Sequence, residues 1–246
     1  GARGWLTVRG ASAHNLQGID VRIPLGCLVG VTGVSGSGKS TLVEEVLFKA
    51  VRRARGEAEG RPGAHRAVEG LEAVGDAVLV DQRAIGRTPR ANALTYTKAM
   101  DPIRRLLAET PEARQAGIGP GHFSFNVPGG RCEQCQGDGY EKIEMQFLSD
   151  VFVRCPQCDG RRFKPEVLAV RYRERSVSDI LEMTVDEALA FFRGRRPIAR
   201  ALEPLARVGL GYLRLGQPLN TLSGGEAQRL KLSRYLEAGG PEGAAG

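Results

Sequence analysis

The 246 residues are enough to bury a hydrophobic core, as one large domain or two smaller ones. Hydrophobic residues make up 41% of the chain, but no apolar run approaches the roughly 20 residues that a membrane-spanning helix needs, and no charged-then-apolar leader opens the sequence. We therefore expect a globular, cytoplasmic protein without a membrane partner. The formal net charge of +7 favours polyanionic partners, although solvated Lys and Arg on ordinary helix faces would give the same value.

The first part of the chain predicts strands around a glycine-rich loop. Residues 5–8 and 18–23 alternate as antiparallel strands do. The loop, residues 33–41, fits the pattern G-x-x-x-x-G-K-[ST] of phosphate-binding loops. An apolar run at 27–32 predicts a buried strand before it, and 41–53 predicts a helix after it. Strand, loop and helix in this order are the context that the pattern requires.

The residue types of this loop suit an anion. Gly33, Gly36 and Gly38 let the backbone curl so that N–H groups point inward, and the following helix adds the positive end of its dipole. Lys39 would reach the outer phosphates of a nucleotide, and Ser40 would hold a magnesium ion. The alternative, a glycine-rich turn that binds nothing, is disfavoured by the complete pattern.

After the predicted helix at 41–53, the amino-acid composition of the chain changes at residue 83. Residues 56–75 are expected to be a surface connection, and 77–80 a short strand that ends in polar Asp81 and Gln82. From there on, cations alternate with Thr, Asn and Tyr: Arg83, Arg87, Arg90, Lys98, Arg104 and Arg105. Such a mixture suits phosphate contacts on nucleic acid, and a plain solvated loop is the alternative.

Four of the five cysteines form two tight pairs. Cys132-x-x-Cys135 and Cys155-x-x-Cys158 are nineteen residues apart, which matches the spacing C-x2-C-x15-20-C-x2-C of structural zinc sites. Four thiolates would close a tetrahedral shell and leave no open catalytic position. Redox dithiols or merely buried thiols are the alternatives. Cys27 stands apart and is expected to pack on the buried strand.

The remaining elements are expected to be scaffold, apart from the last helix. Strands are predicted at 143–147 and 167–172, and helices at 101–109, at 188–192 and from Pro197 to about Val208; Thr184 and Glu187 form a capping box for the second of these helices. Residues 222–229, Leu-Ser-Gly-Gly-Glu-Ala-Gln-Arg, open a final helix. Its Ser223 can cap the helix and donate its hydroxyl to an anion.

A phosphate loop followed far downstream by Leu-Ser-Gly-Gly-Glu-x-Gln resembles the ABC-type ATPases. Within these, the chain is similar to the UvrA family, the damage-recognition subunits of bacterial nucleotide excision repair, because the two cysteine pairs lie between the two motifs. Other stretches that carry this resemblance lie at residues 81–82, 85–90, 123–127, 129–132, 155–160 and 209–212.

The fold class that the resemblance implies is α/β: an ABC-type P-loop nucleotide-binding core, incomplete at its C-terminal end, with an inserted helical, zinc-bearing signature domain. Residues 1–82 would be the core, and residues 83–219 the inserted signature and DNA-binding domain with a four-cysteine zinc module at 131–162. Residues 220–237 would be the signature helix. Residues 238–246, which are only Gly, Ala, Pro and Glu, would be a flexible tail.

The resemblance also implies cofactors and partners, residue by residue. ATP and Mg²⁺ would be bound by Gly33, Ser35, Gly36, Ser37, Gly38, Lys39, Ser40 and Thr41, with Gln82 as the Q-loop glutamine. Ser223, Gly224 and Gly225 would contact the nucleotide of a second nucleotide-binding half. Zn²⁺ would be bound by Cys132, Cys135, Cys155 and Cys158, and double-stranded damaged DNA by Arg87, Arg90, Lys98 and Arg104. A UvrA dimer partner and UvrB would complete the assembly.

In the family, the signature helix is followed by a strand that ends in Asp-Glu and by a switch histidine. Neither occurs before Gly246, so no complete catalytic set is assigned, and ATP hydrolysis by this chain alone is not expected. Two alternatives remain. An ABC-type ATPase subunit of a transporter would have a membrane partner and no zinc, and a zinc-dependent binding or chaperone module of the DnaJ type would have four cysteine repeats and no phosphate loop.

Overall fold

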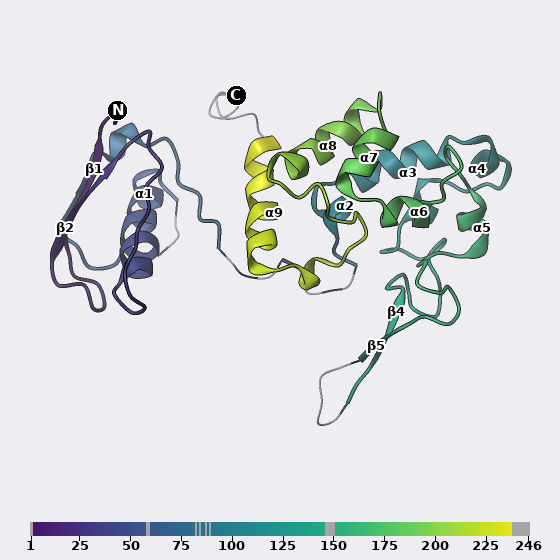
Figure 1. Ribbon diagram of the computed structural model, residues 1–246, viewed down its shortest axis with the longest axis horizontal. Helices are drawn as coiled ribbons and strands as arrows, with labels where there is room; N and C mark the ends of the chain where they lie inside the picture. The colour runs from purple at the N-terminus through teal and green to yellow at the C-terminus, as the bar shows by residue number, and fades with distance from the viewer. Residues whose placement is uncertain are drawn as a thin grey trace. The chain divides into compact units, whose positions relative to one another are not determined.

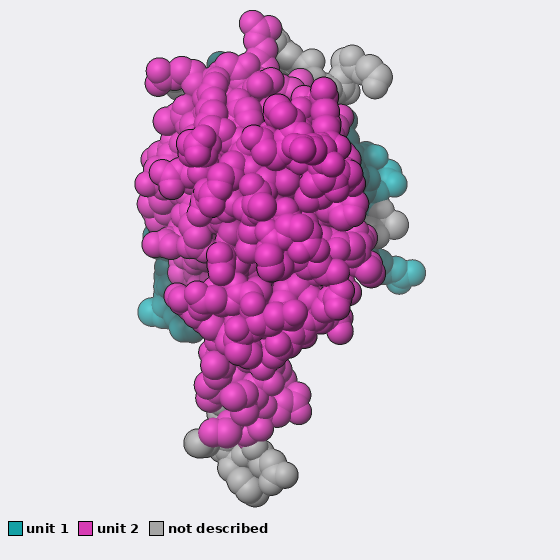
Figure 2. All heavy atoms as spheres, turned by 90° about the vertical axis from the view of Figure 1, so that its right-hand side faces the viewer, with its two compact units in different colours: residues 1–80 teal, residues 81–246 magenta. Residues whose placement is uncertain are grey.

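The chain divides into two compact units, residues 1–80 and residues 81–246 (Figure 2). The structure, a computed structural model, describes residues 2–57, 60–81, 83, 85–86, 88, 90–145 and 151–237. The first unit contains a small sheet and the glycine-rich loop at residues 33–41, and the second is mostly helical and contains the four-cysteine cluster (Figure 1). Among the described helices, none is both long enough and apolar enough to span a bilayer.

The first unit is an antiparallel sheet of three strands, in the order β2-β1-β3, beside one helical segment. Its elements are β1 (Trp5–Ala11), β2 (Ile19–Pro24), η1 (Thr41–Phe48), α1 (Lys49–Ala54), β3 (Ala67–Glu69) and η2 (Leu71–Ala73). Val8 of β1 packs in one cluster with Leu42 and Val46 of η1, which is wound as a π-helix and continues directly into α1. The predicted strand pair and the helix after the loop are confirmed.

Three expectations for the first unit are wrong. Residues 27–32 and 77–80 form no strand, and Cys27 is exposed rather than buried. Conversely, the presumed surface connection contributes β3, which pairs with β1. A strand needs a neighbour to satisfy its backbone N–H and C=O groups, and neither segment pairs with a strand of the β2-β1-β3 sheet.

The second unit packs short helices around one large core. Its elements are α2 (Ala93–Tyr96), α3 (Met100–Ala108), α4 (Pro111–Gln115), η3 (Pro120–Phe123), β4 (Tyr140–Ile143), β5 (Val151–Arg154), α5 (Pro165–Ala169), α6 (Val177–Glu182), α7 (Val185–Phe191), α8 (Arg196–Arg207), η4 (Leu219–Thr221) and α9 (Gly224–Glu237). Completely buried side chains include Leu94, Ile103, Leu107, Ile180, Leu202 and Leu205. This core holds α3 against α8 and α8 against α9.

Capping residues explain where several of these helices begin. The predicted capping box before α7 is present: the Glu187 N–H donates to Thr184 Oγ1 at 3.2 Å, and the Thr184 N–H donates to Glu187 Oε2 at 2.8 Å. Ser176 and Asp179 form the same arrangement before α6. Pro197 lies at the second position of α8, so the predicted helix there is confirmed.

Two predicted strands of the second unit differ from the structure. Residues 167–172 begin inside helix α5, which starts at Pro165 and buries Val167, so alternation over these few residues was a helix face and not a strand. The strand expected at 143–147 ends at Ile143 and begins earlier, at Tyr140, where it pairs with β5. Residues 146 and 147 lie outside the described part of the chain.

Gly70 allows a sensitive test of the first unit. Its backbone is left-handed (φ 86°), and a Cβ atom there would lie 2.3 Å from the carbonyl oxygen of Trp5. We expect Gly70→Ala to lower the free energy of unfolding by about 1–3 kcal/mol, measured by urea denaturation. Gly75→Ala is the matched control, because nothing lies within 4 Å of its Cβ position. Equal unfolding midpoints for the two variants would contradict this account of Gly70.

Candidate functional site

The glycine-rich loop predicted to bind phosphate is closed by its own lysine. Lys39 Nζ donates to the carbonyl oxygens of Gly33 at 2.8 Å and Val34 at 2.7 Å, which holds the ammonium group across the loop. From the first strand-to-strand connection, Asn15 Nδ2 donates to the Gly36 carbonyl at 2.6 Å. Gly38 has a positive φ of 90°, and a Cβ there would lie 2.7 Å from Leu16 Cδ2. A larger residue at that position would therefore distort the loop.

The hydroxyl groups of the loop are accessible. Ser35, Ser37 and Ser40 are exposed, and Thr41 is half-buried at the start of η1. Lys39 Nζ also approaches Ser37 Oγ, at 3.5 Å. The loop thus offers a cation, backbone N–H groups and hydroxyls in one short segment, the chemistry that binds phosphate and hydrated Mg²⁺.

The polar pair at residues 81–82 is only partly described. Gln82 lies outside the described residues. Asp81 forms an ion pair with Lys231 of α9, and the same ammonium donates to the Arg83 carbonyl at 2.7 Å. The hydrogen bond from Lys231 holds the pKa of the Asp81 carboxyl below its ordinary value. Asp81 is therefore occupied in joining the start of the second unit to α9.

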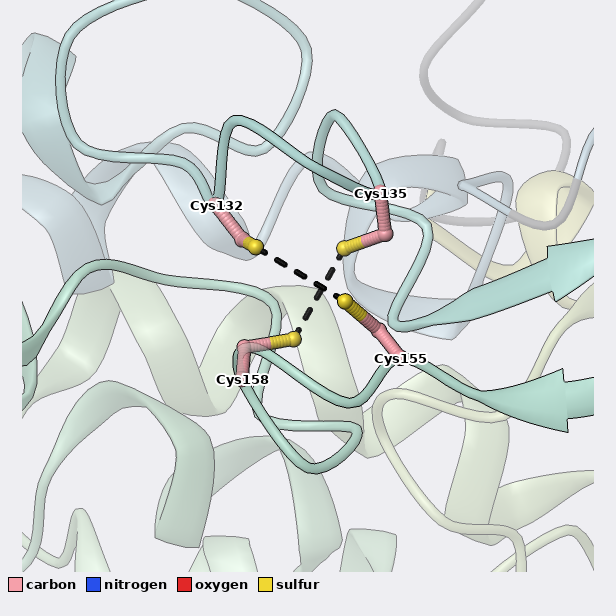
Figure 3. Close-up of side chains that lie close together, drawn as sticks. All are labelled: Cys132, Cys135, Cys155 and Cys158. Atoms are coloured by element: carbon pink, nitrogen blue, oxygen red, sulfur yellow. Dashed lines mark hydrogen bonds between the residues drawn. The ribbon is translucent and has the colours of Figure 1, made fainter.

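The four paired cysteines come together in one buried cluster. All four sulfur atoms lie within 4.8 Å of one another, and Figure 3 shows them facing a common centre. The Sγ–Sγ distance is 3.9 Å between Cys132 and Cys155 and 3.7 Å between Cys135 and Cys158. Each pair contributes one sulfur to each of these contacts, as expected when two turns enclose a single ion.

Each Cys-x-x-Cys pair is followed by a similar tight turn. The Asp138 N–H donates to the Cys135 carbonyl at 2.9 Å, and the Arg161 N–H donates to the Cys158 carbonyl at 2.9 Å. The Gly139 N–H donates to Cys135 Sγ at 3.2 Å, so the backbone already points a donor at the sulfur. Gly137 makes this possible because its φ is 89° and a Cβ would lie 2.5 Å from the Phe125 carbonyl oxygen.

The electrostatics of the cluster suit a cation. Burial raises the pKa of the Cys158 thiol to about 12, and burial likewise raises the pKa of Cys135, because an apolar environment disfavours a thiolate. A divalent ion among the sulfurs would offset this penalty. Four cysteine sulfurs without any carboxylate or imidazole are the donor set of a structural zinc site, and the residues present fit Zn²⁺.

Side chains outside the predicted set attach the cluster to the helical core. Arg162 is buried and lies over the Phe125 ring, 5.7 Å from its centroid. Phe163 meets Phe125 edge to face at 6.1 Å. Burial lowers the pKa of the Arg162 guanidinium. The aromatic residues flanking the cysteine segment were the available sequence signal for this attachment, but spacing alone did not assign them a role.

The four residues predicted to contact DNA are not all equivalent. Arg87 lies outside the described residues. Arg90 Nε donates to Asp138 Oδ1 at 2.6 Å, so this cation supports the first cysteine turn. Lys98 is exposed between α2 and α3, and Arg104 pairs with Asp101 on α3. Lys98 and Arg104 line the same cavity of about 180 Å³, together with Ser124 and Asn126.

The start of α9 is capped as its sequence predicts. The Glu226 N–H donates to Ser223 Oγ at 3.3 Å, while the Ser223 N–H and hydroxyl donate to Glu226 Oε2 at 2.8 and 2.9 Å. Two missed residues complete this network: the Tyr212 hydroxyl donates to Glu226 Oε1 at 2.7 Å, and Arg229 Nη2 donates to Tyr212 at 3.0 Å. The Ser223 N–H, followed by Tyr212, holds the pKa of Glu226 below its ordinary value. Gly224 and Gly225 follow in the first turn and are exposed.

Zinc binding by the cysteine cluster can be tested directly by substitution. Cys155→Ser removes a completely buried sulfur, so we expect zinc to fall from about one ion per chain to well below half, measured by elemental analysis after gel filtration. Cys27→Ser is the matched control, because that thiol is exposed and outside the cluster. Full zinc content in the Cys155 variant would show that the cluster does not bind the metal through this thiolate.

The chain is similar in sequence and in fold to known proteins. No family model matches it. UvrABC system protein A of Methanothermobacter thermautotrophicus and that of Thermus thermophilus are each 55% identical over 232 residues, which are 94% of this chain and 24% of the relative. The Bacillus subtilis protein is 51% identical over the same share of the chain. The crystal structure of UvrA2 from Deinococcus radiodurans superposes with a TM-score of 0.84 at 50% identity, over 96% of this chain and 28% of that one.

The chain spans about a quarter of the length of the curated relatives that it matches. Its mixture of helices and strands follows the fold of the UvrA2 structure over almost every residue. Identity above one half over so large a share of the chain is far more than a shared motif would produce. The family that the motifs indicated is therefore confirmed: this chain belongs, over the segment that it spans, to the UvrA family.

Proposed function

We propose that this chain is the nucleotide-binding, zinc-bearing segment of a damage-recognition subunit that binds distorted duplex DNA in the UvrABC system of nucleotide excision repair. The observation that carries this proposal is the combination, in a chain so similar to UvrABC system protein A, of a phosphate loop, a four-thiol cluster and a capped Leu-Ser-Gly-Gly-Glu helix. A transporter ATPase would account for the first and third features but not for the second.

ATP would bind at the phosphate loop of an ABC-type nucleotide-binding core. Lys39 would exchange the carbonyl oxygens of Gly33 and Val34 for the outer phosphates, and Ser40 would help to hold Mg²⁺. The remaining nucleotide contacts would come from Gly33, Ser35, Gly36, Ser37, Gly38, Thr41 and Gln82. Mg²⁺ would neutralise phosphate charge, and the residues of this chain would bind and orient the nucleotide.

The start of α9 would complete the nucleotide site of a second nucleotide-binding half. Ser223, Gly224 and Gly225 present a hydroxyl and the N-terminal N–H groups of a fourteen-residue helix. The Ser223 hydroxyl, which donates to Glu226, would turn toward a phosphate when the two halves close. Nucleotide would thereby favour the closed state, because only that state contains the complete site.

The zinc module would have a structural role in DNA recognition. Its four thiolates leave no open coordination position, so Zn²⁺ would fold the segment around residues 131–162 and not act on a substrate. Lys98 and Arg104, which line one cavity, would contact the phosphate backbone. Such contacts suit recognition of duplex distortion rather than base sequence. A UvrA dimer partner and UvrB would bind the same assembly.

Titration of intact and damaged duplexes, each at low and at moderate salt, tests the main proposal. We expect tighter binding to the damaged duplex at both salt concentrations, because duplex distortion is recognised, and weaker binding of both duplexes at higher salt, because phosphate contacts release counterions. A chaperone module or a transporter ATPase would show no preference for the lesion. Equal affinity for the two duplexes would reject damage recognition by this segment.

Two substitutions separate nucleotide binding from closure. Lys39→Ala should abolish binding of a fluorescent ATP analogue by the purified chain, because the loop loses its cation. Ser223→Ala should leave that binding intact and abolish ATP-driven association, followed by sedimentation velocity, because the serine serves the partner's nucleotide. If Ser223→Ala weakens nucleotide binding by the isolated chain, the proposed division of roles is wrong.

A further inference from the structure

The second unit has four neighbouring hollows that form a continuous series. The cavity beside Lys98 shares Asp101 and Arg104 with the next hollow. That hollow shares Arg105 with a third, which lies between α3 and α8, and the third shares Pro197 with a fourth along α8. Hollows with common lining residues are adjacent, so the series runs from the α2–α3 junction across α3 to the outer face of α8.

Cationic side chains dominate the whole series. We call them together the α3–α8 track, and they are Lys98, Arg104, Arg105, Arg195, Arg196 and Arg200. The acidic residues that line the same hollows are half as many: Asp101, Glu109 and Glu203. The excess of positive charge is spread along the series and is not concentrated at one point.

Most of these cations are available to a ligand. Within the part of the chain that the structure describes, only Arg104 of the six has an ion pair, with Asp101. Arg195 is oriented by Tyr172, whose hydroxyl accepts from Arg195 Nε at 3.3 Å. Arg196 and Arg200 are exposed and four residues apart on α8, so they lie on the same helix face. Arg196 and Arg200 share their hollow with Glu203 but form no ion pair with it in the described part of the chain, so both can take an anion supplied from outside.

We propose that the α3–α8 track binds the sugar–phosphate backbone of duplex DNA, and that α8 therefore contributes Arg195, Arg196 and Arg200 to DNA binding. This inference rests on the proposed function. The partner that fits is an extended polyanion with regularly spaced charges, because the six cations follow a series of open hollows rather than one enclosed pocket. Guanidinium groups suit such a partner since their planar fork matches phosphate oxygens.

The track has a feature that distinguishes it from a sequence-reading surface. Its cations come from α3, from α8 and from the junction before α3, and no single helix carries them all. Backbone contacts of this kind position a duplex without reading its bases. Loss of track cations should therefore lower the affinity of the chain for intact and for damaged duplexes by the same factor. The preference for the damaged duplex should stay unchanged.

The double variant Arg196→Ala/Arg200→Ala tests the inference. Both side chains are exposed and outside the core, so folding should be preserved. Fluorescence anisotropy with labelled intact and damaged duplexes, between about 50 and 200 mM salt, should show affinity lowered by roughly tenfold or more, and a slope of log affinity against log salt that is smaller by about 2. The variant Arg196→Lys/Arg200→Lys should recover most of the affinity, because it retains the charge.

Arg114→Ala/Arg175→Ala is the matched control. It removes the same charge from exposed positions of the same unit that line none of the four hollows. If the α8 variant and this control bind DNA equally well, the α3–α8 track is not a DNA surface. Its positive charge would then favour an acidic protein as the partner. If the parent chain binds no duplex at all, the proposed function fails together with the track.

Discussion

The cysteine segment of the second unit depends on the convergence of four buried sulfurs. The described residues between the two pairs include the strands β4 and β5, whose side chains are mostly exposed. The sulfur atoms lie within 4.8 Å of one another, a distance at which shared coordination can replace a hydrophobic core. Small modules commonly use a metal in this way because their surface is large relative to their volume.

The cysteine cluster is also connected mechanically to the rest of the unit. Phe125 contacts the first cysteine turn through its backbone and the second through Arg162 and Phe163. Its neighbour Ser124 lines the cavity that contains Lys98. Ser124 and Phe125 therefore connect the cysteine cluster by direct contact with the start of the α3–α8 track. The proposed zinc site and the proposed DNA surface are therefore neighbours in this structure.

The sequence predicted best those features that depend on local chemistry. The capping box before α7 and the Ser223 cap of α9 were predictable because each depends on side chains within three residues of one another. The cysteine cluster followed from spacing. Strands were harder because a strand depends on a neighbour elsewhere in the chain. Residues 27–32 have a strand-like composition but pair with no strand, whereas residues 67–69 pair with β1 and form β3.

Contacts between residues far apart in the sequence also could not be predicted from the sequence alone. The partner of Arg90 lies 48 residues away, so this cation could not be distinguished from Lys98, which has no ion pair within the described residues. The sequence predicts helix α8 only as scaffold, and the role that we propose for its arginines depends on their position beside α3 in the fold. Lys98 itself shows what such a surface requires. Its φ of 58° is a left-handed conformation that glycine adopts without strain. A lysine in this conformation lowers the stability of the fold, so the positive charge at the α2–α3 junction has a conformational cost.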